Sequence, residues 1–367
     1  MAVISTPITA LFGIRHPVFL AGMDTAAGPE LAAAVCNAGG LGVIGGYGYT
    51  PKALRQQIRV LKADLNDRNA PFGVDLLIPQ VGGSARKTNL DYTNGQLPEL
   101  IEVIIEEKAA LFVCAIGVPP RDVVDKLHKA GIPIMNMVGH PKHVKKALDA
   151  GVDLICAQAA EGGGHTGNIP ASILIPACVD AVKGRTSPCT KKPVYVVGAG
   201  GCVRRARAGR ELDVGRAGWV GTRFLASVEA AAPKAHKDHV ISAGFEDAVT
   251  TLIYSGRPMR VKRTPYVEDW NTNRQAEIKE LTSKGILPHY HELEQHPEKT
   301  VEGSRWPLGS VAAVRICWPG ILFWKRPTYN AQLINEVLPA KVIVDNMVEE
   351  AVKMLSQGGN LVKHAKL

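Results

Sequence analysis

Aromatic residues and long apolar runs are scarce in this chain of 367 residues. Phe, Trp and Tyr make up 5% of it, which argues against the aromatic platforms that stack single-stranded nucleic acids. No run approaches the roughly 18 apolar residues of a membrane-spanning helix. The N-terminal segment also lacks the charged and apolar regions of a secretory signal. We therefore expect no nucleic-acid partner and no membrane partner.

Paired cysteines are also absent, since none of the seven lies in a C-x-x-C motif. Most of them fall in apolar runs. This pattern predicts reduced, buried thiols in an intracellular compartment and argues against a zinc site. We expect no metal.

The chain also has relatively few acidic residues. Its 43 Lys and Arg residues exceed its 34 Asp and Glu residues by 43 − 34 = 9. A pI near 9.2 favours an anionic partner. The basic residues are mostly scattered, and their densest group, Arg204 to Arg210, is followed at once by Glu211 and Asp213. A small anionic substrate or cofactor is the preferred interpretation, and a basic surface without function is the alternative.

What the chain does have is a regular alternation of short apolar runs and amphipathic segments. Eight runs are typical of strands in a buried parallel sheet: 18–22, 41–44, 72–77, 111–116, 132–138, 153–157, 194–198 and 219–221. Helices are predicted between them, at 29–37, 51–65, 97–108, 120–129, 141–150, 172–183 and 204–212. Eight such units predict an α/β fold, a closed (β/α)8 TIM barrel. An open doubly wound sheet is the alternative.

Ala-Gly pairs mark several of the predicted helix ends, at 38–39, 130–131, 150–151 and 217–218. A glycine just past a helix takes the left-handed turn without steric cost. Each pair is therefore expected to lie between a helix and the next strand.

The pattern changes after residue 261, which predicts three parts: a barrel over 1–261, an added irregular lobe over 262–330, and a C-terminal part over 331–367. In the last part an amphipathic helix, Ala340–Leu355, is expected to pack back on the barrel and to end in an exposed tail. Trp306, Trp318 and Trp324 argue against a loose segment before that helix.

The C-terminal ends of barrel strands carry the active site, so the residues that follow each strand are the candidates. Glycine-rich turns follow the seventh and eighth strands, at Gly198–Gly201 and Gly221–Phe224. Such turns present backbone N–H groups to an anion, which predicts a phosphate-bearing cofactor. The G-x-G-x-x-G fingerprint is incomplete, because Val203 takes its last place. Ordinary tight turns are the alternative for either loop.

The loop Gly162–Gly167 follows the sixth strand and carries one imidazole, His165, among glycines. Glycine lets a flat ligand approach the backbone, and it offers little packing to a structural histidine. We predict an acid–base or electrostatic role for His165. Gln158 could donate to a heterocycle carbonyl, while Glu161 could be a turn residue only.

With these segments the chain resembles the nitronate monooxygenase family, formerly called 2-nitropropane dioxygenases. The family's A-Q-G-x-E-A-G-G-H-x-G motif is similar to Ala157–Gly167 here, and its A-G-G and G-T-x-F segments match 199–201 and 221–224. Its Ala-Pro-Met turn corresponds to 21–23, and Ser255-Gly256-Arg257 also matches a family segment. The resemblance runs from about Ile14 to Pro258, and a weaker similarity continues to Leu355.

The resemblance implies an FMN-dependent TIM barrel with a catalytic histidine at His165. The implied cofactor-binding residues are Ala21, Gly22, Met23, Asp75, Gln158, Gly163, Gly200, Gly201, Gly221 and Thr222. The last four would hold the phosphate. The chain departs from the family where Asp75 replaces an Asn, where Gly22 replaces a Pro, and where Gly309-Ser310 replaces a Gly-Gln segment.

The implied activity is the oxidation of alkyl nitronates, such as propionate 3-nitronate, by O2 to a carbonyl compound and nitrite. The partners are then a small anionic substrate and O2, and a homodimer is possible. Two alternatives remain open: an NAD(P)H-dependent FMN reductase of enoyl thioesters or other small electrophiles, and a binding barrel without catalysis.

The last three residues, Ala365-Lys366-Leu367, resemble the Ser-Lys-Leu address that a peroxisomal import receptor reads. For a eukaryotic source this predicts a peroxisomal protein, and otherwise a cytoplasmic one.

Overall fold

The structure is a computed structural model, and it describes residues 3–46, 48–81, 83–201, 217–312 and 334–360. Several sequence predictions fall outside these ranges. They are the helix at 204–212, Cys202, Cys317, Trp318, Trp324 and the Ala365-Lys366-Leu367 tail.

Eight parallel strands form the barrel in the order β1-β9-β8-β6-β5-β4-β3-β2. Their bounds are β1 Val18–Leu20, β2 Gly42–Gly46, β3 Phe72–Leu77, β4 Leu111–Ala115, β5 Ile134–Val138, β6 Leu154–Gln158, β8 Tyr195–Ala199 and β9 Ala217–Val220. The two ends of the sheet meet through a bridge between Phe19 of β1 and Leu41, the residue before β2. The predicted (β/α)8 barrel is confirmed, and the open sheet is excluded.

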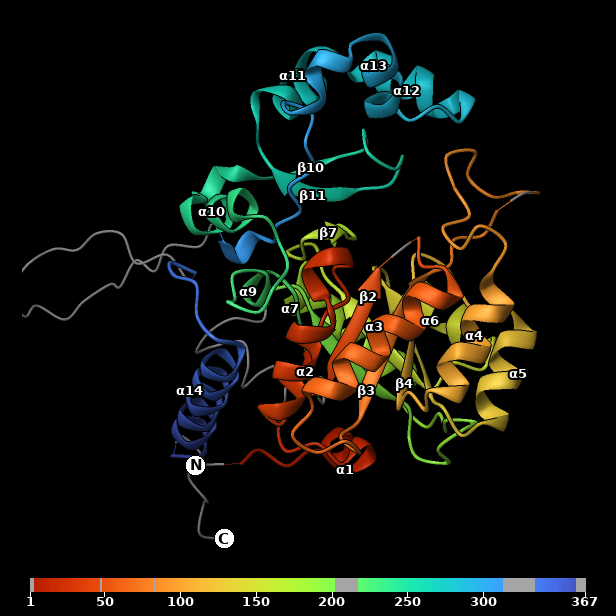
Figure 1. Cartoon of the computed structure of the whole chain (residues 1–367), viewed down its shortest axis with the longest axis vertical. Coiled ribbons are helices and arrows are strands. Elements are labelled where there is room, and N and C mark those ends of the chain that lie inside the picture. The colour runs from red at the N-terminus through yellow and green to blue at the C-terminus, as the bar shows by residue number, and fades with distance from the viewer. Residues whose placement is uncertain (1–2, 47, 82, 202–216, 313–333, 361–367) are drawn as a thin grey trace, which may run out of the picture.

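Helices cover the outside of these strands (Figure 1). They are α2 Pro29–Asn37, α3 Pro51–Asp64, α4 Leu97–Glu106, α5 Arg121–Lys129, α6 Lys142–Asp149 and α7 Ala171–Val182. Six of the seven helices predicted around the barrel are thus present within two residues of their expected ends. Gly39, Gly131 and Gly151 take φ of 93°, 74° and 98°, as predicted for residues just past a helix. The fourth Ala-Gly pair differs, because Ala217 and Gly218 lie inside β9.

Alternate side chains of each strand pack inward and outward. On β4, Leu111 and Val113 belong to the cluster inside the barrel, whereas Phe112 and Cys114 pack outward against the helices. Both faces of the sheet are buried, which explains why the strands appear as continuous apolar runs in the sequence. The short helix α1, Pro7–Phe12, contributes Ile8 and Phe12 to the inner cluster.

A small antiparallel sheet lies over the barrel and was not predicted. Strands β10 Ala248–Thr251 and β11 Met259–Lys262 form a hairpin, and β11 also pairs with β7, Gly164–His165. This hairpin therefore holds the loop that follows β6, which carries His165.

The segment after residue 262 contains more regular structure than the sequence predicts. Three helices follow there: α11 Pro265–Asn273, α12 Gln275–Lys284 and α13 Pro288–Gln295. They pack on one another around Trp270, whose indole donates to buried Glu292 at 2.7 Å. The expectation of an irregular lobe is wrong for this stretch, because its core is built from few large residues rather than from a long apolar face. The limits of the lobe stay a prediction.

The C-terminal helix α14, Ala340–Asn360, packs on α2 with its apolar face, as its pattern predicts. Helix α10, Lys234–Ser242, lies between the barrel and the lobe and was not predicted. Among the described residues, no helix combines the length and the apolar character needed to cross a bilayer.

Candidate active site

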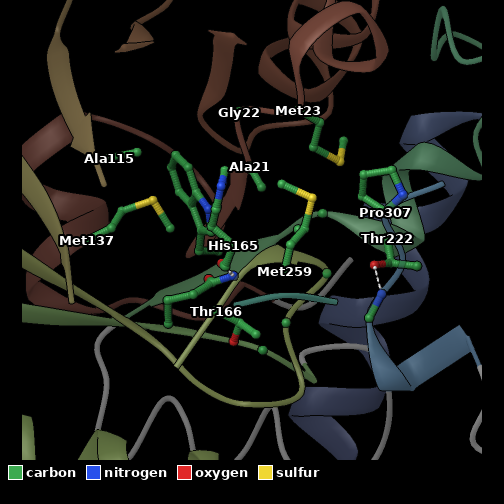
Figure 2. A pocket seen from close by; sticks show the side chains of 18 of the residues that line it. Ala21, Gly22, Met23, Ala115, Met137, His165, Thr166, Thr222, Met259 and Pro307 are labelled. Carbon is green, nitrogen blue, oxygen red and sulfur yellow. Dashed lines mark hydrogen bonds between the residues drawn. The ribbon is translucent and has the colours of Figure 1, made fainter. Parts of the chain in front are cut away.

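A cavity of about 820 Å³ lies at the C-terminal ends of the barrel strands, beneath the small sheet. Its wall includes all eleven residues that the sequence singled out: Ala21, Gly22, Met23, Asp75, Gln158, Gly163, His165, Gly200, Gly201, Gly221 and Thr222. Figure 2 shows His165 in the same space as the side chains of Met23, Met137 and Met259. The fold thus brings together candidates that are up to 201 residues apart (222 − 21).

Asp75 lies in the wall of this cavity, on strand β3. Its side chain is buried, and its Oδ1 has no hydrogen-bond partner within the described part of the chain. Burial raises the pKa of the carboxyl to about 7. A Cβ on Gly22 would come within 2.3 Å of Asp75 Oδ2, so only glycine permits this approach. A buried polar atom without a partner marks a place where a ligand can donate or accept.

The turn after β8 has the left-handed geometry that glycine allows. Gly200 and Gly201 take φ of 94° and 93°. A Cβ on Gly200 would meet Ala159 O at 3.0 Å, so this turn lies directly against the end of β6. The two glycines leave the backbone open to the cavity, as an anion-binding turn requires.

The neighbouring turn after β9 is fixed by a segment from far along the chain. Gly309 N donates to Thr222 Oγ1 at 2.9 Å, and this is the dashed line in Figure 2. The hydroxyl accepts in this bond, so its own proton remains available to a ligand oxygen. Gly309 also lies close to Gly163, where a Cβ would meet Gly309 N at 2.7 Å. The Gly309-Ser310 segment therefore closes this end of the cavity.

His165 is held by the hairpin on both its backbone and its side chain. It pairs with Met259 in the small sheet, and its Nε2 lies 2.8 Å from Ser255 Oγ. Burial lowers the pKa of His165 to about 4, and the positive charges of Arg305 and Arg257 act in the same direction. The imidazole is therefore neutral at pH 7, and the positive charge beside it comes from the arginines.

The two polar residues before the glycine run have different environments. Gln158 lies in the cavity wall, and its Nε2 approaches His165 O at 3.4 Å. Both oxygens of Glu161 accept from Ala171 N, at 3.0 and 3.3 Å, at the start of helix α7. Glu161 thus anchors the following helix, which agrees with its interpretation as a turn residue.

Backbone strain marks the rim of the cavity at Ile116, just after β4. This β-branched residue has φ of 70°, which is rarely adopted outside glycine. Buried Asn136 stabilises the turn, because its Nδ2 donates to Cys114 O at 2.8 Å and to Gly117 O at 2.7 Å. Such strain is concentrated at functional sites.

Sequence reasoning missed most of the basic residues of the cavity. Arg86, Arg257 and Arg305 line it together with Lys142, His140 and His143. The three arginines and His140 come from loops without apolar periodicity, so no periodic pattern could place them. Lys142 and His143 lie at the start of helix α6. Of these residues, only Arg257 could have been identified from the sequence, since it belongs to the Ser255-Gly256-Arg257 segment that matches the family.

A second cluster of polar side chains lies at the opposite end of the barrel, before β6. One ligand atom each from His128, Asp153 and Cys189 falls within 4.8 Å of the others. Asp153 Oδ2 already binds His128 Nε2 and Ile134 N, both at 2.8 Å, and Oδ1 accepts from Ser187 Oγ at 2.6 Å and from Cys189 N at 3.0 Å. Burial raises the pKa of the Cys189 thiol to about 11. Both oxygens of Asp153 already accept hydrogen bonds, and the Cys189 thiol keeps its proton. These two features favour a structural cluster over a metal site.

The comparisons with known proteins agree with this geometry. The family model of nitronate monooxygenase matches residues 5–293. A dehydrogenase of Mycobacterium tuberculosis, named for 5-hydroxy-7a-methyl-1-oxo-octahydro-1H-indene-4-carboxyl-CoA, is 33% identical over 74% of this chain and 70% of its own. A probable nitronate monooxygenase of Staphylococcus saprophyticus is 28% identical over 73% of this chain and 81% of its own.

Solved structures share the fold over nearly the whole chain. FabK from Thermotoga maritima superposes with a TM-score of 0.75 at 25% identity, covering 98% of this chain and 100% of its own. Nitroalkane oxidase from Streptomyces ansochromogenes superposes with a TM-score of 0.74 at 23% identity, covering 95% of this chain and 99% of its own. The chain belongs to the nitronate monooxygenase family and is a flavin-dependent oxidoreductase.

Proposed function

We propose that this protein binds FMN and oxidises alkyl nitronates with O2, giving a carbonyl compound and nitrite. The observation that carries the proposal is the convergence of His165, Asp75 and two glycine turns on one cavity at the C-terminal ends of the strands. Family membership supports the same chemistry. A pre-formed cavity with a few convergent polar groups is what a cofactor site requires.

The donor set fits a flavin mononucleotide. Gly200, Gly201, Gly221 and Thr222 would hold one phosphate, because they offer backbone N–H groups and a hydroxyl proton at one end of the cavity. Asp75 Oδ1, which is buried and without a partner among the described residues, would meet a polar edge of the ring system, with Ala21, Gly22, Met23 and Gln158 beside it. A bound flavin would supply the redox chemistry, accepting electrons from the nitronate and passing them to O2.

The residues of the chain would bind and orient the substrate. A nitronate is an anion, and Arg257 and Arg305 place positive charge beside His165. Neutral His165 can accept or donate one hydrogen bond at the reacting carbon or nitro group without carrying charge itself. Its ring cannot swing freely, since Ser255 binds Nε2 at 2.8 Å. The hairpin and the segment at Gly309 lie against the cavity and narrow it.

The test uses the purified holoprotein and no nicotinamide cofactor. Addition of propionate 3-nitronate should cause oxygen uptake and nitrite release, and the flavin released by heat should chromatograph as FMN. A protein that carries flavin but consumes no oxygen with any alkyl nitronate would contradict the proposal. Recovery of FAD would contradict the assignment of the phosphate-binding glycines.

The second candidate function is an NAD(P)H-dependent reduction of an enoyl thioester or another small electrophile. It is favoured by the 33% identity to a dehydrogenase of a CoA ester and by the basic residues at the cavity. Anaerobic addition of NADPH separates the two functions. Rapid loss of the visible flavin absorbance would support the reductase, and an unchanged spectrum would support the nitronate oxidase.

A further inference from the structure

Two arginines lie next to each other in the cavity wall, on segments that are far apart in the sequence. Arg86 belongs to the loop after β3, and Arg257 belongs to the turn of the β10–β11 hairpin. Arg86 Nη1 donates to Gly256 O at 3.1 Å, which fixes its guanidinium against the backbone beside Arg257. We call Arg86 and Arg257 the arginine pair.

The two segments are locked together, so the arginine pair is a built feature. Gly256 has φ of 64°, and a Cβ there would come within 2.4 Å of Thr88 Oγ1. Arg257 donates from Nε and Nη2 to Asn89 Oδ1, at 3.3 and 3.0 Å. Residues 86–89 and 256–257 thus hold the two guanidinium groups in one place.

No carboxylate compensates the arginine pair. In the described ranges neither Arg86 nor Arg257 has an Asp or Glu within ion-pair distance, whereas Lys262 and Arg274 each have at least one. Burial and the neighbouring charge of Arg86 lower the pKa of Arg257 from its ordinary value. Two like charges held together against a cavity are unfavourable unless an anion enters between them.

One member of the arginine pair, Arg257, also lies within electrostatic range of the predicted catalytic group. Arg257 acts on His165, whose ring is bound by Ser255, two residues before Arg257 in the same turn. An anion on the arginine pair would therefore belong to the same ligand whose reacting end lies at His165.

We propose that the arginine pair is an oxyanion subsite that selects substrates with a second negative group, distinct from the group that reacts at His165. This inference rests on the proposed function only for the group that reacts at His165. Guanidinium forks match the planar geometry of carboxylate and phosphate oxygens. The oxyanion has two possible sources, the carboxylate of a short nitronate or a phosphate of a coenzyme A thioester.

The test compares matched ligands on the holoprotein of the wild type and three variants. Arg257→Gln and Arg86→Gln remove one guanidinium each. Arg59→Gln is the control, because Arg59 is an exposed arginine on α3, away from the cavity. The substrates are propionate 3-nitronate and propyl-1-nitronate, which have the same length and differ in the carboxylate. Dissociation constants are also measured for 3-nitropropionate, 1-nitropropane and propionyl-CoA.

With a carboxylate as the source, Arg257→Gln raises the KM for propionate 3-nitronate about 10- to 100-fold. The KM for propyl-1-nitronate then rises less, through loss of the charge that Arg257 also places beside His165, and 3-nitropropionate loses affinity while the neutral 1-nitropropane does not. With a phosphate as the source, the affinity of Arg257→Gln for propionyl-CoA falls by a similar factor. The KM values for the two nitronates then change by the same factor in this variant. Arg86→Gln, at an exposed residue that should not impair folding, follows the same pattern.

The proposal is overturned if all ligands bind the Arg257 and Arg86 variants as tightly as they bind Arg59→Gln. The outcome is separable from the proposed function. Weakened binding of 3-nitropropionate or propionyl-CoA in a protein that oxidises no nitronate would keep the subsite and reject the nitronate oxidase.

Discussion

His165 is an imidazole that its surroundings keep uncharged at pH 7. Its pKa falls to about 4, so it holds no proton beyond its neutral state over most of the range in which enzymes are assayed. The sequence could place His165 in a glycine run and could suggest an acid–base or electrostatic role. It could not show that Arg257 and Arg305 supply the charge, because these residues lie 92 (257 − 165) and 140 (305 − 165) positions away.

A substitution of His165 tests its role at the site. His165→Asn should keep the flavin, since within the described residues the ring hydrogen-bonds only to Ser255 and its loop is glycine-rich. Turnover should fall by about 10²–10⁴-fold, the usual loss for one positioned proton-transfer or charge-stabilising group. In the wild type the pH profile should show no acidic limb from His165 between about pH 5 and 8. Turnover of the variant within a few-fold of the wild type would make His165 structural.

Asp75 should make stability depend on pH in a predictable direction. Its pKa is about 7 in the folded protein and 3.8 as the reference value, so the folded state binds more protons between these two values. Stability therefore falls as the pH rises through this window. The shift corresponds to about 4 kcal/mol at most.

The measurement is urea unfolding of the flavin-free wild type and of Asp75→Asn across this window. The variant has no titrating carboxyl, so its stability relative to the wild type should increase from pH 5 to pH 8 by about 2 kcal/mol or more. A difference between the two proteins that does not change with pH would mean that the Asp75 pKa is not raised.

At the scale of elements, the strands and helices of the barrel could be predicted because each one buries an apolar run of recognisable length. The β10–β11 hairpin could not, since its pairing with β7 joins residues 164–165 to residues 259–260 and no local pattern encodes such a contact. Helices α11–α13 were missed for a related reason. Their stabilising contacts, such as Arg274 stacked at 3.4 Å on the Trp270 ring, are made by single side chains rather than by an apolar stripe.

The Asp153 cluster joins several elements and gives a stability prediction at this scale. Asp153→Ala removes four hydrogen bonds and leaves the N–H groups of Ile134 and Cys189 without their acceptor. The expected loss is about 3 kcal/mol in the free energy of unfolding.

The wild type should unfold at the same urea concentration with and without EDTA. A lower midpoint in EDTA would show that the cluster of His128, Asp153 and Cys189 holds a metal.

At the scale of the whole molecule, the barrel supplies a rigid frame and the later segments supply the cover. The (β/α)8 arrangement explains why candidates near the C-terminal ends of different strands line one cavity. It does not explain substrate choice, since Arg86, Arg257 and Arg305 come from the loops and the hairpin above the barrel. The fold was therefore predictable from local patterns, whereas the charge of the site depends on how these segments pack over it.

The central claim, that nitronates are oxidised in the His165 cavity, is tested most directly by anaerobic mixing of the holoprotein with propionate 3-nitronate. The visible absorbance of the flavin is followed in the wild type and in His165→Asn. The account predicts that the wild-type flavin is reduced rapidly without NAD(P)H, and that reduction is at least about 100-fold slower in the variant. A wild-type flavin that the nitronate leaves unchanged, but that NADPH reduces at once, would contradict it.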